Sequence, residues 1–175
     1  LSPFTTTSQS ATASSVKLLC CQSAADSATA RSVSFDDSDD YLEAPSSTDF
    51  QMSGDFTIEC FFKSSSVSNV NVILNGRGTS SSGGPVIYTN GTTLVFDNGN
   101  GTVCSLASAI ETGRWYHVAG TRTGNTWRLF LDGTEVAIGT DSTSYTSARG
   151  FVIGKSHHAG EFYGGLVSNV RVTKG

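Results

Sequence analysis

The segment FTIECFF, residues 56–62, constrains the fold most strongly, because it alternates with a period of two. The residues that share one face of the extended chain are all apolar: Phe56, Ile58, Cys60 and Phe62. Alternation of this kind places one face of a β-strand against a core. No segment of the chain has a sustained 3.6-residue period, so we expect almost no helix.

Comparable short segments follow one another along the chain, separated by clusters of Gly, Asn, Asp and Ser. They predict further strands at Val16–Cys21, Asn71–Leu74, Val86–Tyr88, Thr93–Phe96, Val103–Leu106, Phe151–Ile153 and Leu166–Val172. About a dozen short strands joined by glycine-containing turns predict an all-β fold, a two-sheet antiparallel jelly-roll sandwich.

A meander of three strands is predicted by RWYHVAGTRTGNTWRLFLDGTEV. Thr123-Gly124-Asn125 is interpreted as a three-residue hairpin loop, and Asp132-Gly133 as a type I′ turn. With this loop, His117 shares a face with Trp127, and Tyr116 lies on the opposite face. The residues grouped with Trp127 are His117, Ala119, Leu129 and Leu131, and those grouped with Tyr116 are Val118 and Phe130. Bulky side chains on both faces predict strands in the middle of a sheet.

The composition excludes two classes of partner. Only 15% of residues are charged, the net charge is −4, and no stripe of Lys and Arg occurs, so nucleic acid is not an expected partner. No apolar run approaches the roughly 20 residues of a membrane span, so membrane insertion is not expected. The N-terminus has none of the features of a secretory signal.

The four cysteines predict buried thiols rather than a disulfide scaffold or a zinc site. Cys20 and Cys21 are adjacent, and neighbouring strand residues point to opposite faces, which disfavours a bond between them. Cys60 and Cys104 lie in strand-like segments, where a thiol behaves as a small apolar side chain. A thiol-rich core is typical of a protein assembled in a reducing cytoplasm.

The chain divides into two parts by composition. Residues 1–15 have almost no apolar side chain after Phe4 and predict a linker or extended arm. Residues 16–175 have the length of one β-sandwich domain.

Three phrases in residues 16–175 resemble laminin G-like modules of the concanavalin A-like superfamily. They are SVSFDDSDDYLEAPSSTDFQMSGDFTIECFFK, GRWYHVAGTRTGNTWRLFLDGTEV and FVIGKSHHAGEFYGGLVSNVRVTKG, in the order that the family has them. The resemblance implies a concanavalin A-like sandwich. It does not imply one function, because this superfamily includes lectins, adhesion modules, glycanases and spacers.

The segment VKLLCCQS before the first phrase resembles segments that recur in tandem arrays of virion proteins of marine bacteriophages. This resemblance implies a non-enzymatic virion surface module, in a tail fibre or a capsid-decorating protein, that mediates attachment or assembly. Its expected partners are other virion proteins or copies of itself, as a homo-oligomer at the virion surface, made in the host cytoplasm. The abrupt ends at Leu1 and Gly175 predict a portion of a longer polypeptide.

A carbohydrate-binding lectin module for host adhesion is the alternative function. Lectin sites on sandwiches combine aromatic side chains with amides and carboxylates in loops at one edge. Five residues in or beside turn-rich segments are candidates for such a site: Tyr88, Asn90, Tyr145, His158 and Tyr163. Tyrosines in loops are equally typical of subunit contacts.

A secreted glycan-active enzyme is the least favoured function. Glycanases of this superfamily carry an E-x-D-x-E strand, and the chain has none. Glu59 has no second carboxylate on its strand, and Glu161 lies in a glycine-flanked loop. His117 is interpreted as a hydrogen-bonded structural histidine. We therefore predict that the protein is not an enzyme.

The acidic turn at residues 36–40 offers carboxylate oxygens, which Ca²⁺ prefers as ligands. Related modules often hold calcium near this turn, with an Asp pair in the closing strand. The matching residues here are Ser168 and Asn169, so at least one carboxylate is lost. We favour a solvated turn without a cofactor; for a Ca²⁺ site, the expected side-chain ligands are Asp40 and Asn169.

Overall fold

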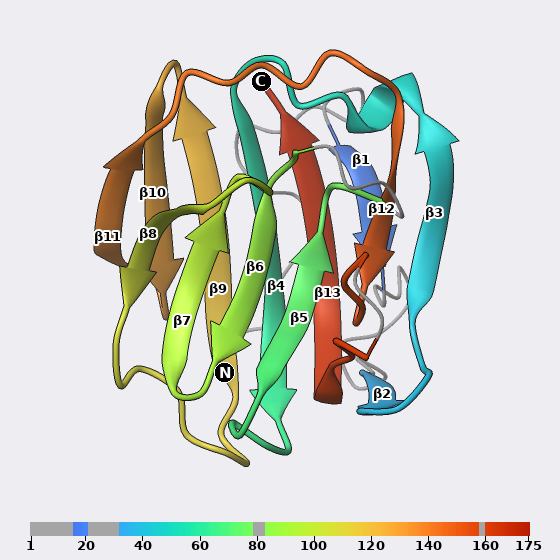
Figure 1. The fold of residues 1–175 in the computed structure, drawn as a ribbon, viewed down its shortest axis with the longest axis vertical. Coiled ribbons are helices and arrows are strands. Elements are labelled where there is room, and N and C mark those ends of the chain that lie inside the picture. Colours follow the sequence, from blue (N-terminus) through green and yellow to red (C-terminus); the bar gives the residue numbers. More distant parts are fainter. Residues whose placement is uncertain (1–15, 21–31, 79–82, 158–159) are drawn as a thin grey trace, which may run out of the picture.

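The computed structural model describes residues 16–20, 32–78, 83–157 and 160–175 (Figure 1). These residues form thirteen β-strands in two antiparallel sheets, with one short 3₁₀ helix at Thr48–Phe50 and no α-helix. The predicted all-β sandwich is therefore confirmed. No helix within these ranges is long and apolar enough to cross a membrane.

Sheet A has seven strands in the order β1-β13-β4-β9-β10-β11, and β2 also pairs with β13. Its strands are β1 (Val16–Cys20), β2 (Val33–Asp36), β4 (Phe56–Ser64), β9 (Tyr116–Thr123), β10 (Thr126–Leu131), β11 (Thr134–Thr140) and β13 (Gly164–Lys174). The long β13 carries two short partners on one side. β2 pairs with its first residues and β1 with its last.

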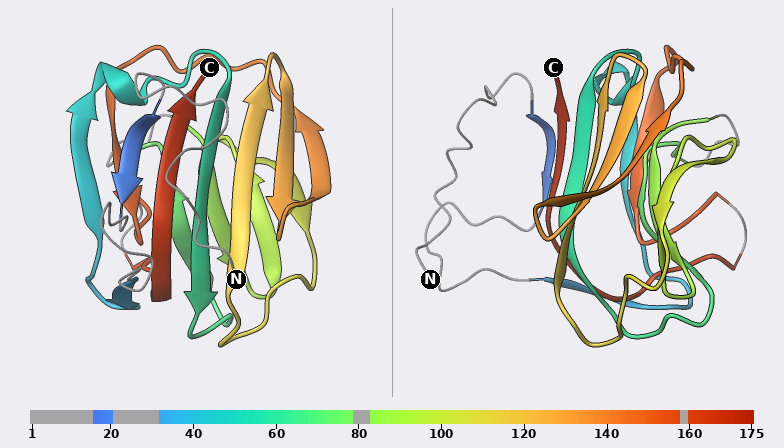
Figure 2. Two further views of the ribbon diagram at one scale, coloured as in Figure 1. Left: turned by 180° about the vertical axis from the view of Figure 1, so that it is seen from behind. Right: turned by 90° about the vertical axis from the view of Figure 1, so that its left-hand side faces the viewer.

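Sheet B has six strands in the order β3-β12-β5-β6-β7-β8. They are β3 (Leu42–Ser47), β5 (Val70–Asn75), β6 (Val86–Asn90), β7 (Thr93–Asp97), β8 (Thr102–Leu106) and β12 (Arg149–Ile153). The side view in Figure 2 shows the two sheets as two packed layers. The predicted strands of this sheet are all present, each extended by one or two residues at its ends.

β4 has the alternation that the sequence predicts. Along the strand, buried residues alternate with half-buried ones. Ile58, Cys60 and Phe62 are among the buried residues. Cys60 and Cys104 are free thiols, and burial raises the pKa of Cys104 to about 11, which keeps it protonated. The prediction of buried thiols is confirmed for these two; Cys21 and the side chain of Cys20 lie outside the described residues.

Trp127 lies at the centre of the core and is fully buried. Phe56 of the same sheet meets it edge-to-face at 5.4 Å between ring centroids, and Phe96 of sheet B meets it at 4.7 Å. The ring of Phe96 occupies the space above Gly120, where an added Cβ would lie 2.6 Å from that ring. Gly120 therefore lets the two sheets approach around the aromatic cluster.

The hairpin between β9 and β10 differs from its prediction by one residue. Thr123 pairs with Thr126, so the loop has two residues, Gly124 and Asn125, and the three-residue loop was wrong. Side chains alternate along a strand, so this shift moves the partners of Trp127 to the other face. Tyr116 and Val118 are buried with Trp127, whereas His117 and Ala119 face outward with Phe130.

The turn between β10 and β11 agrees with its prediction. Asp132 and Gly133 both have positive φ, at 48° and 81°, as a type I′ turn requires. The carboxylate of Asp132 also accepts the backbone N–H of His117 at 2.9 Å. This bond links the turn to the start of β9.

The space above Gly120 generates a stability prediction. Gly120→Ala forces Phe96 to move, and we expect a loss of about 1–3 kcal/mol in the free energy of unfolding. Gly54→Ala is the matched control, because no atom lies within 4 Å of its added Cβ. Urea denaturation of both variants measures the difference; equal stabilities would contradict this account of the core.

Candidate functional site

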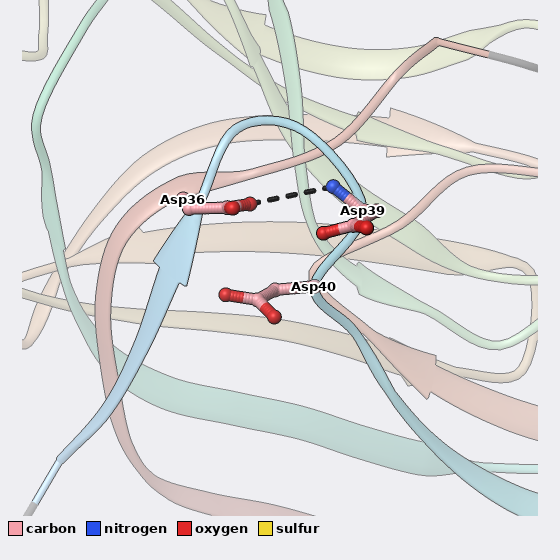
Figure 3. A group of neighbouring side chains, drawn as sticks. All are labelled: Asp36, Asp39 and Asp40. Atoms are coloured by element: carbon pink, nitrogen blue, oxygen red, sulfur yellow. Dashed lines mark hydrogen bonds between the residues drawn. The ribbon is translucent and has the colours of Figure 1, made fainter.

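The acidic turn after β2 brings together Asp36, Asp39 and Asp40, all exposed (Figure 3). One carboxylate oxygen from each lies within 4.8 Å of those of the other two. Asp36 Oδ1 accepts the backbone N–H of Ser38 at 2.9 Å and that of Asp39 at 3.3 Å. These bonds lower the pKa of Asp36 and hold the turn in shape.

The three carboxylates of this turn fit a hard divalent cation such as Ca²⁺ in part. Asp36, Asp39 and Asp40 would supply side-chain oxygens, and Ca²⁺ takes 6–8 in total, so carbonyl or water oxygens would complete the set. A bound ion would stiffen the turn.

The structure does not place Asn169 with Asp40. Asp36 pairs with Gly164, and Asn169 lies five residues further along β13, about 16 Å away at the usual rise of a strand. Asn169 has a φ of 53° in an irregular part of the pairing between β13 and β4. Asn169 therefore lies far along β13 from the turn that carries Asp40.

Tyr88 lies on the outer face of sheet B, the face that points away from the core. Its neighbours along the strand, Ile87 and Thr89, are buried on the inner side. Tyr88 pairs with Val72 on one side and Val95 on the other. Its ring is half-buried, and this burial raises the pKa of the phenol, while a hydrogen bond with Thr102 opposes the rise.

The residues around Tyr88 on the outer side of sheet B are apolar and buried. Four outer-face valines are at most 5% exposed: Val72, Val86, Val95 and Val152. The described residues of the segment that follows β12, on either side of 158–159, extend outward beyond sheet B (Figure 2). These valines are closed to a ligand, so the accessible apolar group here is the half-buried ring of Tyr88.

Arg77, in the loop between β5 and β6, provides a cation that interacts electrostatically with Tyr88. Its Nη1 donates to the carbonyl of Gly99 at 3.3 Å, and the N–H of Gly99 donates to Asp97. Asp97 and Glu161 attract the guanidinium electrostatically, although burial lowers the pKa of Arg77. Its Nε is shielded from solvent and has no hydrogen-bond partner among the described residues. The cluster thus combines an aromatic ring, one cation and two carboxylates.

Asn75 joins the two loops that carry these charges. The side chain is fully buried, and its Oδ1 accepts the backbone N–H of Arg77 at 3.0 Å. Its Nδ2 donates to the carbonyls of Gly78 and Lys155 at 3.2 and 3.1 Å. Lys155 in turn pairs with Phe162, next to Glu161. One amide group therefore sets the positions of both loops.

Of the five predicted ligand residues, Tyr88 and Asn90 lie on this face, with Asn90 exposed at the turn after β6. Tyr145 is 4% exposed and donates to the carbonyl of Asn98 at 2.9 Å. Tyr163 is fully buried, edge-to-face against Phe35. These two rings belong to the core and are closed to a ligand. His158 lies outside the described residues.

Sequence reasoning did not identify Arg77 and Asp97 as site residues, and it considered Glu161 only as a catalytic acid. Asp97 ends β7, and Arg77 follows the end of β5 by two residues. Polar residues directly after strands that flank Tyr88 were the available signal. It could be used only once the order of the strands was known.

The outer face of sheet A carries a different network around Glu59. Arg171 of β13 donates to Glu59 Oε1, and His117 Nε2 lies 3.1 Å from Glu59 Oε2. Phe61 packs on the His117 ring at 4.9 Å between centroids. Burial alone would raise the pKa of Glu59. The hydrogen bond with His117 and the charge of Arg171 outweigh this effect, so the pKa is lowered overall. The predicted hydrogen-bonded His117 is confirmed.

A shallow hollow of about 380 Å³ lies on the same outer face of sheet A, at the level of Thr57 and Thr173. Thr173, Thr57, Thr121 and Arg128 follow one another across β13, β4, β9 and β10, and they line it together with Asp55. The hollow offers hydroxyls but no exposed aromatic ring. It is the weaker candidate for a binding site.

A sequence model of the Laminin_G_3 family, described as the concanavalin A-like lectin/glucanases superfamily, matches residues 36–175. Among solved structures, domains LG4-5 of the mouse laminin α1 chain are 19% identical with a TM-score of 0.63. The alignment covers 81% of this chain and spans 40% of that one. No curated protein sequence matches the chain.

Two carbohydrate-binding modules have the same fold. CBM66 from Bacillus subtilis is 15% identical with a TM-score of 0.51, covering 76% of this chain and 78% of that one. The CBM40 module of Ruminococcus gnavus IT-sialidase, bound to α2,3 sialyllactose, is 17% identical with a TM-score of 0.54, covering 77% and 89%.

The network of Glu59 generates a pH prediction. Since its folded pKa is lowered, Glu59 stabilises the fold above its unfolded pKa of about 4.3, and this contribution is lost as the pH falls through the folded pKa. Glu59→Gln should therefore cost about 1–3 kcal/mol at pH 7. We expect the difference from the wild type to shrink at pH 3, as measured by urea denaturation at both values.

Glu135→Gln is the control for this pH experiment. Its carboxylate pairs with Arg128 at 3.2 Å but is 46% exposed, so we expect a cost of about 0–1 kcal/mol. A cost for Glu59→Gln that stays constant between pH 7 and pH 3 would contradict an ionic role.

Proposed function

This chain belongs to the concanavalin A-like lectin/glucanases superfamily, and we propose that it is a non-catalytic carbohydrate-binding module whose ligand lies on the outer face of sheet B. The observation that carries the proposal is Tyr88, a half-buried aromatic ring on the outer face of sheet B that interacts electrostatically with Arg77 and Asp97. An aromatic face packs against the C–H surface of a sugar ring, and a few fixed polar groups bind its hydroxyls. The two carbohydrate-binding modules with this fold support the proposal.

The positions of Glu59 and Glu161, the pair considered for catalysis, support a non-catalytic role. Glycosidases place two carboxyl groups about 5–9.5 Å apart across the scissile bond. Glu59 lies on the outer face of sheet A, and Glu161 lies beside Arg77 on the far side of sheet B. Packed sheets are about 10 Å apart, so these two cannot act on one bond. Glu59 is also engaged by Arg171 and His117.

We also propose that this module is part of a virion surface protein. It rests on the resemblance of VKLLCCQS to segments of phage arrays, and Val16–Cys20 of that segment forms β1 against β13. In this setting, glycan binding would serve attachment to a host, and repeated weak sites would add through avidity.

The outer-face site is tested by glycan-array binding followed by calorimetry on the best ligand. We expect a dissociation constant in the millimolar range or tighter, and Tyr88→Ala should weaken it about tenfold or more, the loss typical of a central aromatic contact. Trp115→Ala is the control, because Trp115 is an exposed aromatic side chain, at 41% exposure, outside the cluster.

Two outcomes would contradict the proposed site. Equal losses in the Tyr88→Ala and Trp115→Ala variants would place the ligand elsewhere. Binding that disappears with a calcium chelator but survives Tyr88→Ala would move the site to the turn of Asp36, Asp39 and Asp40.

The virion setting is tested by the sequence that flanks residues 1–175. Further laminin G-like modules in a cluster of phage structural genes would support it. A cellular gene neighbourhood with no phage genes would contradict it, without affecting the carbohydrate-binding proposal.

A further inference from the structure

We propose that the hollow on the outer face of sheet A is a second binding site, which takes a saccharide through its hydroxyl groups. This site lies on the opposite side of the sandwich from Tyr88 and does not depend on the site proposed there. With both sites, one module would hold two glycans at once, one on each face.

The hollow exists because the side chains across the middle of sheet A are short. Thr57 pairs with Thr173 on one neighbouring strand and with Thr121 on the other, so these three side chains form a row on the outer face. Two residues further along, Glu59 pairs with Arg171, and their longer side chains rise above the threonine row. The hollow has a volume of about 380 Å³, within the range of roughly 300–1,000 Å³ that is usual for ligand pockets.

A fixed turn forms the other side of the hollow. Asp55 Oδ1 accepts the backbone N–H of Gly124 at 2.7 Å, which joins the residue before β4 to the turn between β9 and β10. Arg122 is 5% exposed, and its Nε donates to the carbonyl of Gly124 at 2.7 Å. Its Nη1 donates to the carbonyl of Thr143 at 2.6 Å. The lining is therefore in place before a ligand binds, which reduces the entropic cost of binding.

The hollow presents hydrogen-bonding groups that the protein itself leaves without partners. The hydroxyls of Thr57, Thr121 and Thr173 make no hydrogen bond to any residue that the structure describes. Arg128 uses its Nε in a surface ion pair, and a guanidinium has further N–H groups to donate. The carboxylate of Asp55 has a second oxygen that can accept.

A saccharide matches this set of groups. Hydroxyls both donate and accept hydrogen bonds, so a row of threonine hydroxyls can bind several hydroxyls of one sugar ring. An apolar ligand would leave the same groups unpaired, which costs binding free energy. The hollow has no exposed aromatic ring, so it would recognise the hydroxyls of a sugar, whereas Tyr88 would contact its C–H surface.

NMR of the threonine methyl groups of the full chain tests this site directly. The probes are glucose, galactose, mannose, fucose and N-acetylglucosamine, each added in a separate titration. We expect at least one of them to shift the methyl signals of Thr57 and Thr121 until they saturate, with a dissociation constant in the millimolar range. The same shifts should occur in the Tyr88→Ala variant, because Tyr88 lies on the other sheet.

Thr121→Val removes one hydroxyl and keeps the branched shape of the side chain. It should weaken binding about two- to tenfold, the effect of one hydrogen bond. Thr57→Val should have the same effect and serves as the second variant. Thr134→Val is the control, because Thr134 is exposed and lies outside the hollow. Thermal unfolding of each variant identifies those that fold.

The outcomes separate this site from the site around Tyr88. No saturating shift with any of the five sugars would overturn the second site and leave the first untouched. Shifts that vanish in Tyr88→Ala would also overturn it, because they would originate on sheet B. Unchanged affinity in both Thr57→Val and Thr121→Val would overturn recognition through hydroxyls. Glycan-array binding that Thr121→Val weakens and Tyr88→Ala does not would support the hollow and overturn the site on sheet B.

Discussion

The packing of Trp127 between the two sheets is the interaction on which the rest of the structure depends. It contacts Phe56 within sheet A and Phe96 across the interior. Phe96 fits only because Gly120 opposite it has no side chain. Contacts of this kind fix the distance and the register of the two sheets, because a close-packed interior tolerates little change in volume. Every outer-face residue takes its position from that register.

The two outer faces use the same alternation for different purposes. On sheet A, the residues between the core positions of β4 and β9 bind one another, and Glu59, His117 and Arg171 hold three adjacent strands together. On sheet B, the outer positions next to Tyr88 are valines; Asp97 comes from the end of β7, and Arg77 and Glu161 come from loops. The charged centre of the first face is satisfied by its own contacts. The second presents a half-buried aromatic ring with charged groups around it, which is the reason to place a ligand there.

The faces of individual strands could be predicted where one strand alone decides them. The alternation of apolar residues in β4 predicted which of them are buried. The residue types of Asp132-Gly133 predicted the turn. The face of His117 could not be predicted in this way, because it depends on whether the neighbouring loop has two residues or three. A difference of one residue exchanges every side chain between core and surface. Tyr145 and Tyr163 were misplaced for a related reason, since a tyrosine beside a turn looks the same in sequence whether its ring points in or out.

The sequence by itself determined the class of fold and the core of its central strand, because a period of two and glycine turns are local properties of the chain. It also identified Tyr88 as a candidate. Only the tertiary structure decided which residues surround that ring. Arg77, Asp97 and Glu161 come from three separate segments, and the buried amide of Asn75 brings two of those segments together. Long-range pairing of strands sets such neighbours, and no local pattern records it.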